Sequence, residues 1–447
     1  MKHAGVRSAV CLAALVLAGR SFGAESGGQP VTYAKDVAAI LREKCEECHR
    51  KGTAAPMSLA TYEEVRPWAK AIRERVITRN MPPWHIDRTL GIQHFENDRS
   101  LSDAQIATIV RWVDSGAPAG DPQDLPPPKP WPSDEGWQLE KSFGPPDLIL
   151  KSEPYTMPAR GQDVWFKPLT DVPVTEPRWV RAVEMRPGSA AGRKIMHHVL
   201  ARLVQDESGR PANPNAPAGT PPGMLMEWAI GKNFDVYRPN SGKLLLPGSR
   251  IWWELHLHAV GEQVRDHAEL AVYFYPKGET PKNRTYLTMF PATARFGIGI
   301  DIPPNTVAQT QGYQVLRQPA RLENFQPHMH LRGKAMSLEA ILPDGTTRLL
   351  SYVDHFNFNW MNNYIYADDA APVLPKGTII HVSAWHDNTR SNPNNPDPDQ
   401  WVGFGDRTVD EMAHAWVNVT YLSEAEYAEW AAAHKTEPGE GARRARQ

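Results

Sequence analysis

The chemistry-bearing residues nearest the N-terminus form one compact motif, Cys45-Glu46-Glu47-Cys48-His49. Two thiols separated by two residues and followed directly by histidine are the pattern for covalent attachment of haem, with the histidine as the proximal iron ligand. A redox-active thiol pair is the alternative, because Cys-x-x-Cys also occurs in thiol oxidoreductases. We predict one covalent c-type haem, held by Cys45, Cys48 and His49.

A sixth iron ligand must come from farther along the chain. Methionine is the usual choice in electron carriers, because its thioether raises the reduction potential. Met57 and Met81 both qualify, and His85 is a weaker candidate. We predict Met81, because the two prolines that follow it make a rigid loop ahead of the next helix. This segment resembles the small cytochromes c, and the resemblance implies that the helix containing Trp112 packs across the first one.

Three histidine clusters follow in the rest of the chain, at His197-His198, His256-x-His258 and His328-x-His330. Side chains at i and i+2 of a strand project from one face, so the last cluster is a good half-site for one metal. Adjacent histidines point to opposite faces of a flat strand, so the first pair requires a bulge or a strand end to bind one metal jointly. Any one histidine could simply satisfy a hydrogen bond in the core, but three clusters favour metal binding.

The order of these clusters resembles the copper type II, ascorbate-dependent monooxygenases, the family of peptidylglycine hydroxylating monooxygenase and dopamine β-monooxygenase. The resemblance covers about residues 146–422. Its landmarks are the His197-His198 pair, Glu254-Leu255-His256, the strand-like run 270–274, His328-x-His330-Leu-x-Gly and Asp410-Glu411-Met412.

The resemblance also implies which residues hold metal. By position, His197, His198 and His256 match the ligands of an electron-transferring copper. The oxygen-binding, catalytic copper would be held by His328, His330 and Met412. Imidazole suits copper in both oxidation states, and one weak thioether favours Cu(I), the state that meets oxygen. We therefore expect two coppers, one on each of two domains that face each other across an open cleft.

Two departures from the family pattern bear on the substrate. The eukaryotic members join their domains by disulfides, whereas Cys11 lies in the expected export signal and leaves only Cys45 and Cys48 in the mature chain. Gln326 stands where the peptide-amidating enzyme has an arginine that binds the substrate carboxylate. Peptide amidation is therefore not expected. His258 and His414 lie close to the ligands without matching them and are expected to be supporting or structural.

The elements that must position these residues change character along the chain. Residues from about 31 to 116 have helical periodicity, including a capping box at Ser102 and Gln105 ahead of a helix that Gly116 ends. A Pro-rich stretch, which reads as a stiff linker without a packed core, follows. Beyond it, alternating apolar runs separated by Pro, Gly and Asn turns indicate β-structure, interrupted near 276–282.

We therefore predict a multidomain protein with a small all-α cytochrome c domain followed by two all-β jelly-roll sandwich domains. The expected boundaries are a signal peptide at 1–23, a haem domain at 31–120, a linker at 121–145, β-sandwiches at 146–283 and 284–425, and a tail at 426–447.

Composition restricts the partners. The 49 Lys and Arg against 51 Asp and Glu give a net charge of −2. The chain therefore has no overall positive charge with which to bind nucleic acid. Lys2 and Arg7 precede a short apolar run that indicates an export signal, with an uncleaved anchor as the alternative. No later stretch is long enough to span a membrane. We expect a periplasmic or secreted protein.

The sequence thus predicts a copper-dependent monooxygenase that uses O2 to hydroxylate an unidentified small organic substrate. Its haem would pass electrons to the copper at His197, His198 and His256, with a possible external donor upstream. A non-catalytic electron-transfer or copper-binding protein is the alternative. A zinc hydrolase is less favoured, because no acidic residue stands in a His-x-x-x-His arrangement.

Overall fold

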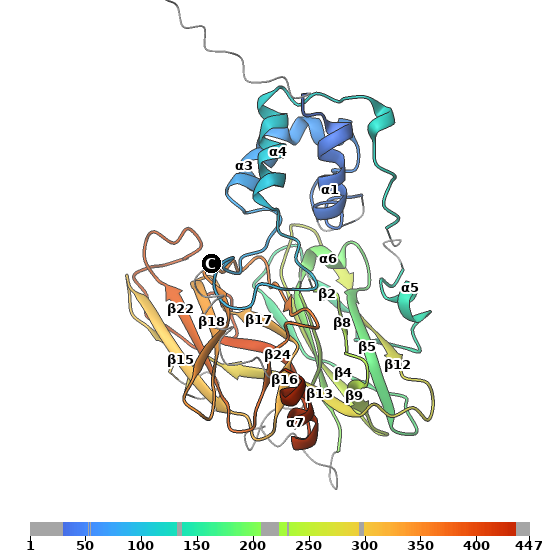
Figure 1. The fold of residues 1–447 in the computed structure, drawn as a ribbon, viewed down its shortest axis with the longest axis vertical. Coiled ribbons are helices and arrows are strands. Elements are labelled where there is room, and N and C mark those ends of the chain that lie inside the picture. The colour runs from blue at the N-terminus through green and yellow to red at the C-terminus, as the bar shows by residue number, and fades with distance from the viewer. Residues whose placement is uncertain are drawn as a thin grey trace, which may run out of the picture.

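The computed structural model describes residues 30–51, 53, 55–131, 136–206, 223–229, 232–294 and 299–434. Over this part of the chain the protein is β-rich and multidomain, with few helices (Figure 1). The longer N-terminal helices gather at one end of the molecule, next to the strands. The expected signal peptide and the end of the charged tail lie outside the described residues.

The N-terminal helical part surrounds a small apolar core. Its elements are η1 (Tyr33–Val37), α1 (Ala38–Lys44), α2 (Tyr62–Val65), η2 (Arg66–Trp68), α3 (Ala69–Ile77), α4 (Asp103–Asp114) and η3 (Pro122–Asp124). Leu41 of α1 and Trp112 of α4 are both buried in this core. The predicted capping box is confirmed, because Ser102 and Gln105 exchange hydrogen bonds at the start of α4. The predicted end of this helix is confirmed too, with Gly116 at a φ of +95° just beyond it.

A first set of strands follows a short helix, α5 (Glu140–Phe143). The set comprises β1 (Leu148–Lys151), β2 (Tyr155–Met157), β3 (Val164–Phe166), β4 (Leu169–Asp171), β5 (Arg178–Pro187), β6 (Met196–Val204), β7 (Met224–Ala229), β8 (Phe234–Val236), β9 (Ser241–Leu245), β10 (Arg250–Leu257), β11 (Val264–Asp266) and β12 (Ala268–Phe274), with α6 (Gly192–Ile195) before β6. Met185, Trp253 and Leu270 lie in one apolar core between these strands.

A second set of strands completes the β part. It comprises β13 (Asn283–Pro291), β14 (Asp301–Ile302), β15 (Val307–Val315), β16 (Ala320–Leu322), β17 (Asn324–His328), β18 (Gly333–Ile341), β19 (Thr347–Val353), β20 (Tyr364–Ile365), β21 (Val373–Leu374), β22 (Ile379–Asp387), β23 (Val402–Gly403) and β24 (His414–Tyr421). Phe325, Leu338 and Val382 share its apolar core.

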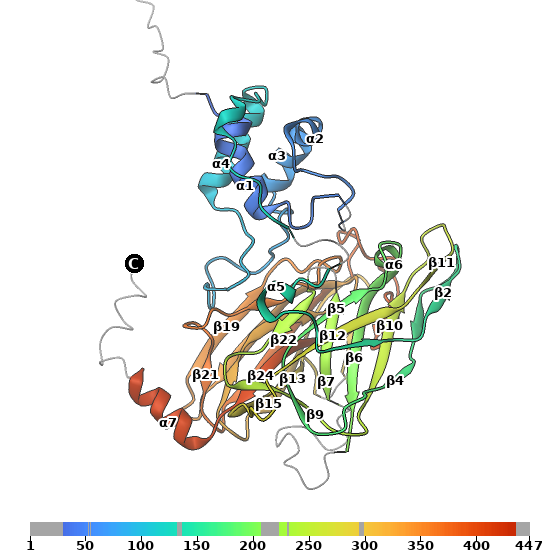
Figure 2. The ribbon, with the colours of Figure 1, turned by 90° about the vertical axis from the view of Figure 1, so that its right-hand side faces the viewer.

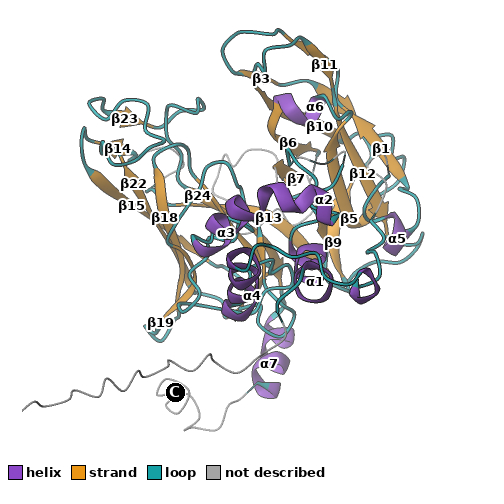
Figure 3. Ribbon diagram, turned by 90° about the horizontal axis from the view of Figure 1, so that it is seen from above, coloured by secondary structure: helices purple, strands orange, loops and turns teal. Residues whose placement is uncertain are grey.

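The strand β13 joins the two sets. It pairs parallel with β9 and antiparallel with β7 of the first set, and antiparallel with β24 of the second. The second set also contains a four-stranded sheet in the order β15-β22-β18-β19. Seen from above, the two sets lie on either side of the molecule (Figure 3). The backbone therefore continues from one set to the other, while each keeps a separate apolar core.

The expected haem domain, 31–120, is not self-contained. The segment 84–97 leaves the helices and packs into the core of the second strand set, where Trp84 and Phe95 are 8% and 6% exposed. Phe95 also forms a β-bridge with Tyr366. The boundary prediction is corrected here, because the apolar side chains of this segment are buried against the second strand set and not in the helical core.

The expected linker, 121–145, is also corrected in its last part. Trp137 and Leu139 are buried against Ala182 and Tyr273 of the first strand set. A plain spacer would leave these side chains in water, so burial of their apolar surface anchors the end of this segment to the sheet.

The expected tail from 426 onward begins inside a helix. The helix α7 (Glu424–Ala433) has a capping box between Ser423 and Glu426, and Glu426 also pairs with Lys282 at 3.1 Å. This helix lies at the end of the β part remote from α1–α4 (Figure 2). Among the described residues, no helix is both long and apolar enough to cross a membrane.

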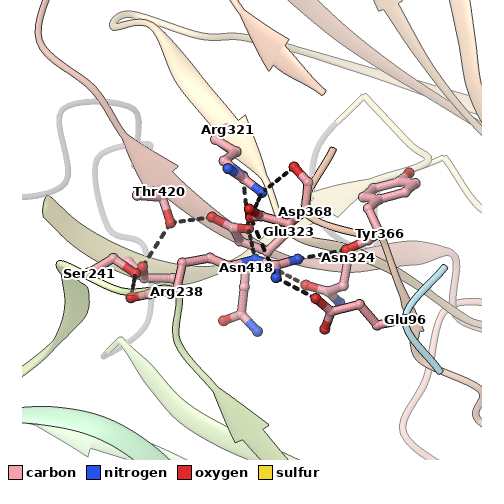
Figure 4. Close-up of polar contacts among 11 residues, drawn as sticks. Glu96, Arg238, Ser241, Arg321, Glu323, Asn324, Tyr366, Asp368, Asn418 and Thr420 are labelled. Carbon is pink, nitrogen blue, oxygen red and sulfur yellow. Dashed lines mark hydrogen bonds and ion pairs between the residues drawn. The ribbon is translucent and has the colours of Figure 1, made fainter. Parts of the chain in front are cut away.

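A polar cluster ties the three parts of the chain together (Figure 4). Arg238, between β8 and β9, donates to Glu96 of the segment 84–97. It also donates to Glu323 of the second strand set, at 3.3 Å. Its guanidinium also donates to the Tyr366 carbonyl at 2.7 Å. Arg321 pairs with Asp368 at 2.7 Å beside it. These charge-assisted bonds fix the packing of segments that are far apart in sequence.

Candidate metal centres

His197, His198 and His256 converge on one point of the first strand set. His198 on β6 lies directly opposite His256 on β10, and the register shifts immediately afterwards, so that Met196 faces Leu257. His197 is the extra residue in this bulge, which turns its ring toward the other two. One ring nitrogen from each histidine lies within 4.8 Å of the others. The expectation that the adjacent pair needs a bulge is confirmed.

The surroundings of this cluster leave nitrogen atoms available. The Nδ1 atoms of His197, His198 and His256 are buried and have no hydrogen-bond partner among the described residues. The Nε2 of His256 lies 2.9 Å from a carboxylate oxygen of Asp163, and its ring stacks on Trp165 at 4.2 Å. Buried unpaired nitrogens are costly unless a ligand satisfies them. The cluster of three histidines therefore fits a bound metal ion.

Burial also keeps these imidazoles in the form that binds metal. Burial lowers the pKa of His197 to about 3, and the pKa of His198 falls well below its usual value for the same reason. The pKa of His256 is lowered by burial, partly offset by the hydrogen bond with Asp163. Neutral imidazole has a free lone pair, so these residues are ready to coordinate at neutral pH.

The second cluster lies at the end of β17. His328 is 7% exposed and His330 is 4% exposed, and their ring centroids are 5.6 Å apart. The Nδ1 of His330 lies 3.1 Å from the carbonyl oxygen of Asp410, which directs Nε2 away from that segment. Met412 follows two residues later and is half-buried. The predicted ligand segment therefore lies against His330.

A buried carboxylate organises this second cluster. Glu411 is 0% exposed, and it accepts the backbone N–H of His330 at 2.9 Å and that of Arg332 at 2.6 Å. Burial raises the pKa of Glu411 to about 8. His386, also fully buried, lies with Nε2 3.2 Å from the Met412 carbonyl oxygen. These contacts hold the chain around Met412 in place.

The two clusters touch, so the expected open cleft between them is wrong. The ring centroids of His198 and His328 are 6.0 Å apart. Phe358 of the second strand set stacks on His197 at 4.7 Å and contacts His330 edge-on at 6.0 Å. Aromatic packing between the two sets brings the clusters together. His414 stacks on His328 at 4.6 Å, as expected of a supporting residue.

The motif Cys45-x-x-Cys48-His49 forms a tight turn after α1. Both cysteines are free, and the His49 backbone N–H donates to the Cys45 carbonyl at 2.9 Å. The Nδ1 of His49 lies 3.2 Å from the Met57 carbonyl oxygen, which leaves Nε2 to face a ligand. Burial raises the pKa of Cys45 to about 12 and that of Cys48 above its usual value. Reactive thiol pairs have lowered pKa values, so this environment does not favour a redox-active thiol pair.

The candidates for the sixth iron ligand occupy different places. Met57 contributes its carbonyl on the Nδ1 side of His49, the side remote from a metal on Nε2. Met81 lines a small hollow with Val76 and Trp84, and none of the three motif residues lines that hollow. His85 donates its backbone N–H to the Tyr364 hydroxyl at 3.2 Å. The contacts of Met57 disfavour it, and Met81 stays a prediction.

Gln326 is committed to an internal contact. Its amide donates to Glu227 at 2.6 Å, and both residues are 1% exposed. Lys232 pairs with the same carboxylate at 3.6 Å. The Gln326 side chain is therefore not available to bind a substrate carboxylate, in keeping with the departure noted from the sequence.

Three residues of the site were missed by the sequence reasoning. Asp163 and Phe358 lie in loops and reach the histidines only through tertiary packing, so no local pattern marks them. His386 lies on β22, on the same face as buried Ala384 and Val382. This two-residue spacing was a signal for an inward-facing imidazole.

Comparisons with known proteins assign no family. No protein-family model matches the chain, and no curated protein matches it. The major capsid protein P2 from bacteriophage PM2 is 13% identical with a TM-score of 0.29, over 62% of this chain and 99% of that chain. Infectious bursal disease virus (Gx strain) is 8% identical with a TM-score of 0.17, over 61% and 72% of the two chains. Paenibacillus xanthan lyase is 10% identical with a TM-score of 0.16, over 69% and 28%. Scores this low carry no argument about function.

Proposed function

We propose that this protein is an exported, haem- and copper-dependent monooxygenase that hydroxylates a C–H bond of a small organic substrate with O2. In this proposal a cytochrome c domain precedes two jelly-roll domains, and electrons arrive through the c-type haem. The observation that carries it is the convergence of His197, His198 and His256: one ring nitrogen of each lies within 4.8 Å of the others, and their buried Nδ1 atoms have no hydrogen-bond partner among the described residues.

The donor sets support copper at both clusters. Three neutral imidazoles suit copper in either oxidation state, and His328 and His330, with Met412 as the proposed third ligand, would offer the softer set that favours Cu(I). When bound, copper supplies one-electron chemistry and binds oxygen. The chain's own residues orient these donors: Asp163 holds the His256 ring, and the Asp410 carbonyl holds that of His330.

The motif at Cys45, Cys48 and His49 supports haem as the electron source. His49 is oriented by the Met57 carbonyl, and the two thiols are buried rather than activated. Once bound, haem accepts and donates single electrons, which is how a copper monooxygenase must be supplied. The segment 84–97 anchors this part of the chain to the second strand set.

A non-catalytic electron-transfer or copper-binding protein is the second candidate. It is favoured by the contact between His198 and His328, whose ring centroids are only 6.0 Å apart. A monooxygenase needs room for oxygen and substrate beside its catalytic copper, and rings this close leave little room between the two clusters.

Metal analysis with an optical spectrum of the purified protein tests the proposal. We expect one covalent haem and two coppers per chain, and oxygen consumption by the reduced protein. His328→Ala should leave one copper at His197, His198 and His256 and abolish oxygen consumption. A wild-type protein that binds one copper, or prefers zinc under physiological supply, would contradict the enzyme and leave the second candidate.

A further inference from the structure

One short loop of the second strand set contacts both the two histidine clusters and the segment from Pro83 to Asn97, which follows Met81. This loop, Phe358–Tyr364, is the last part of the connection from β19 to the start of β20, and none of its residues is among the landmarks of the resemblance. Its two ends contact different parts of the molecule, and only a few residues separate them.

The Tyr364 end is bonded to the segment that follows Met81. Asn362 is 5% exposed, and its side-chain amide donates to the Pro83 carbonyl at 3.0 Å. Tyr364 packs edge-on against Trp84, with ring centroids 4.7 Å apart. The Asn97 side chain donates to the Asn363 carbonyl at 2.7 Å. Three consecutive residues of the loop thus hold the segment that leaves the haem-bearing helices.

The Phe358 end lies between the histidine clusters. Its ring is nearly parallel to that of His197, at 17° and 4.7 Å, although the two residues belong to different strand sets. The same ring meets His330 at 84° and 6.0 Å. Phe358 thus contacts one proposed ligand of each copper, His197 of the first cluster and His330 of the second.

We propose that the loop Phe358–Tyr364 is the bridge through which the haem-bearing part delivers electrons to the histidine clusters, with Phe358 as the positioning residue at the receiving end. The inference rests on the proposed function. In the step it serves, one electron leaves the iron, which goes from ferrous to ferric, and reduces one cupric ion to cuprous. No proton or bond change is required. Delivery would thus reach both clusters through one residue, rather than entering at His197, His198 and His256 alone.

The test follows the haem in protein that holds both coppers. Under anaerobic conditions, one flash of a photoexcited flavin reduces the haem, and its absorbance then reports reoxidation by cupric ion. Phe358→Leu keeps an apolar side chain of similar size but removes the stacked ring. We expect reoxidation to be slower than in the wild type, because loss of the ring removes the contacts of residue 358 with His197 and His330. Asn362→Leu, at the other end of the loop, should slow it as well.

Two controls separate bridging from a general disturbance. His355→Leu changes a ring in the preceding turn whose side chain is 82% exposed, and it should reoxidise at the wild-type rate. Copper content, haem potential and thermal unfolding should match the wild type in every variant compared. Equal rates in wild type, Phe358→Leu and His355→Leu would overturn the bridge alone. A wild-type haem that stays reduced with both coppers present would overturn electron delivery, and the bridge with it.

Discussion

Replacing Asp163 by asparagine tests how the first histidine cluster is held. Asp163 lies in the loop before β3, and its carboxylate is 2.9 Å from the Nε2 of His256. That bond fixes the tautomer in which Nδ1 faces the other two histidines and makes the ring more basic as a ligand. Asparagine keeps an oxygen acceptor of the same size, so the change removes the charge while preserving the shape.

The expected loss follows from the exposure of the carboxylate. Removing such a supporting partner weakens metal binding by about 10- to 100-fold, or about 1.4 to 2.7 kcal/mol. The Asp163 side chain is 37% exposed, so water screens its charge. Asparagine also retains a hydrogen bond. We therefore expect a loss near the lower end, about tenfold.

The assay is an anaerobic Cu(I) titration against a competing chelator, in a His328→Ala background so that the first site is counted alone. The control is Glu262→Gln, which removes an exposed carboxylate that pairs with Lys194 at 2.9 Å in the same strand set. Equal copper affinities in the Asp163 and Glu262 variants would refute the role given to Asp163. Removing the carboxylate bonded to His256 would then affect copper binding no more than removing an exposed carboxylate elsewhere.

Three further predictions follow from other parts of the molecule. Phe95→Ala should lower the free energy of unfolding by about 3–5 kcal/mol, because the ring lies in the core of the second strand set; a loss below about 1 kcal/mol in urea unfolding would contradict its docking. The metal-free protein should lose stability as the pH falls below about 6.5. In the folded protein His197 and His414 are buried and have pKa values of about 3, so they stay neutral, whereas in the unfolded chain the same histidines become protonated. At about pH 5 each contributes a loss of about 2 kcal/mol, and a urea midpoint unchanged from pH 7 would be inconsistent with neutral burial. The double variant Cys45→Ala, Cys48→Ala should carry no haem through denaturing gel electrophoresis, whereas haem retained by that variant would show that the attachment lies elsewhere.

The parts of the site that sequence predicted are those governed by short-range geometry. Cys45, Cys48 and His49 lie within one turn, and the capping box of Ser102 and Gln105 lies at one helix start. The need for a bulge at His197 also follows from strand alternation alone, because neighbouring side chains point to opposite faces. Each of these inferences involves residues a few positions apart, whose relative placement the local backbone conformation determines.

Other features depended on contacts between distant segments. The pairing of β6 with β10, which sets His198 opposite His256, is a choice of register that no local pattern specifies. The segment 84–97 was expected to belong to the helical domain, yet its aromatic side chains are buried in the second strand set.

The sequence by itself determined which residues we propose for the chemistry: the two thiols and the histidine at Cys45, Cys48 and His49, and the histidine pairs of the two clusters. Only the tertiary structure decided how close the clusters lie, because Phe358 comes from one strand set and His197 from the other. Residue type and spacing set what a side chain can bind. Distances across an interface depend on how whole sheets pack, which is the sum of many weak contacts spread over the chain.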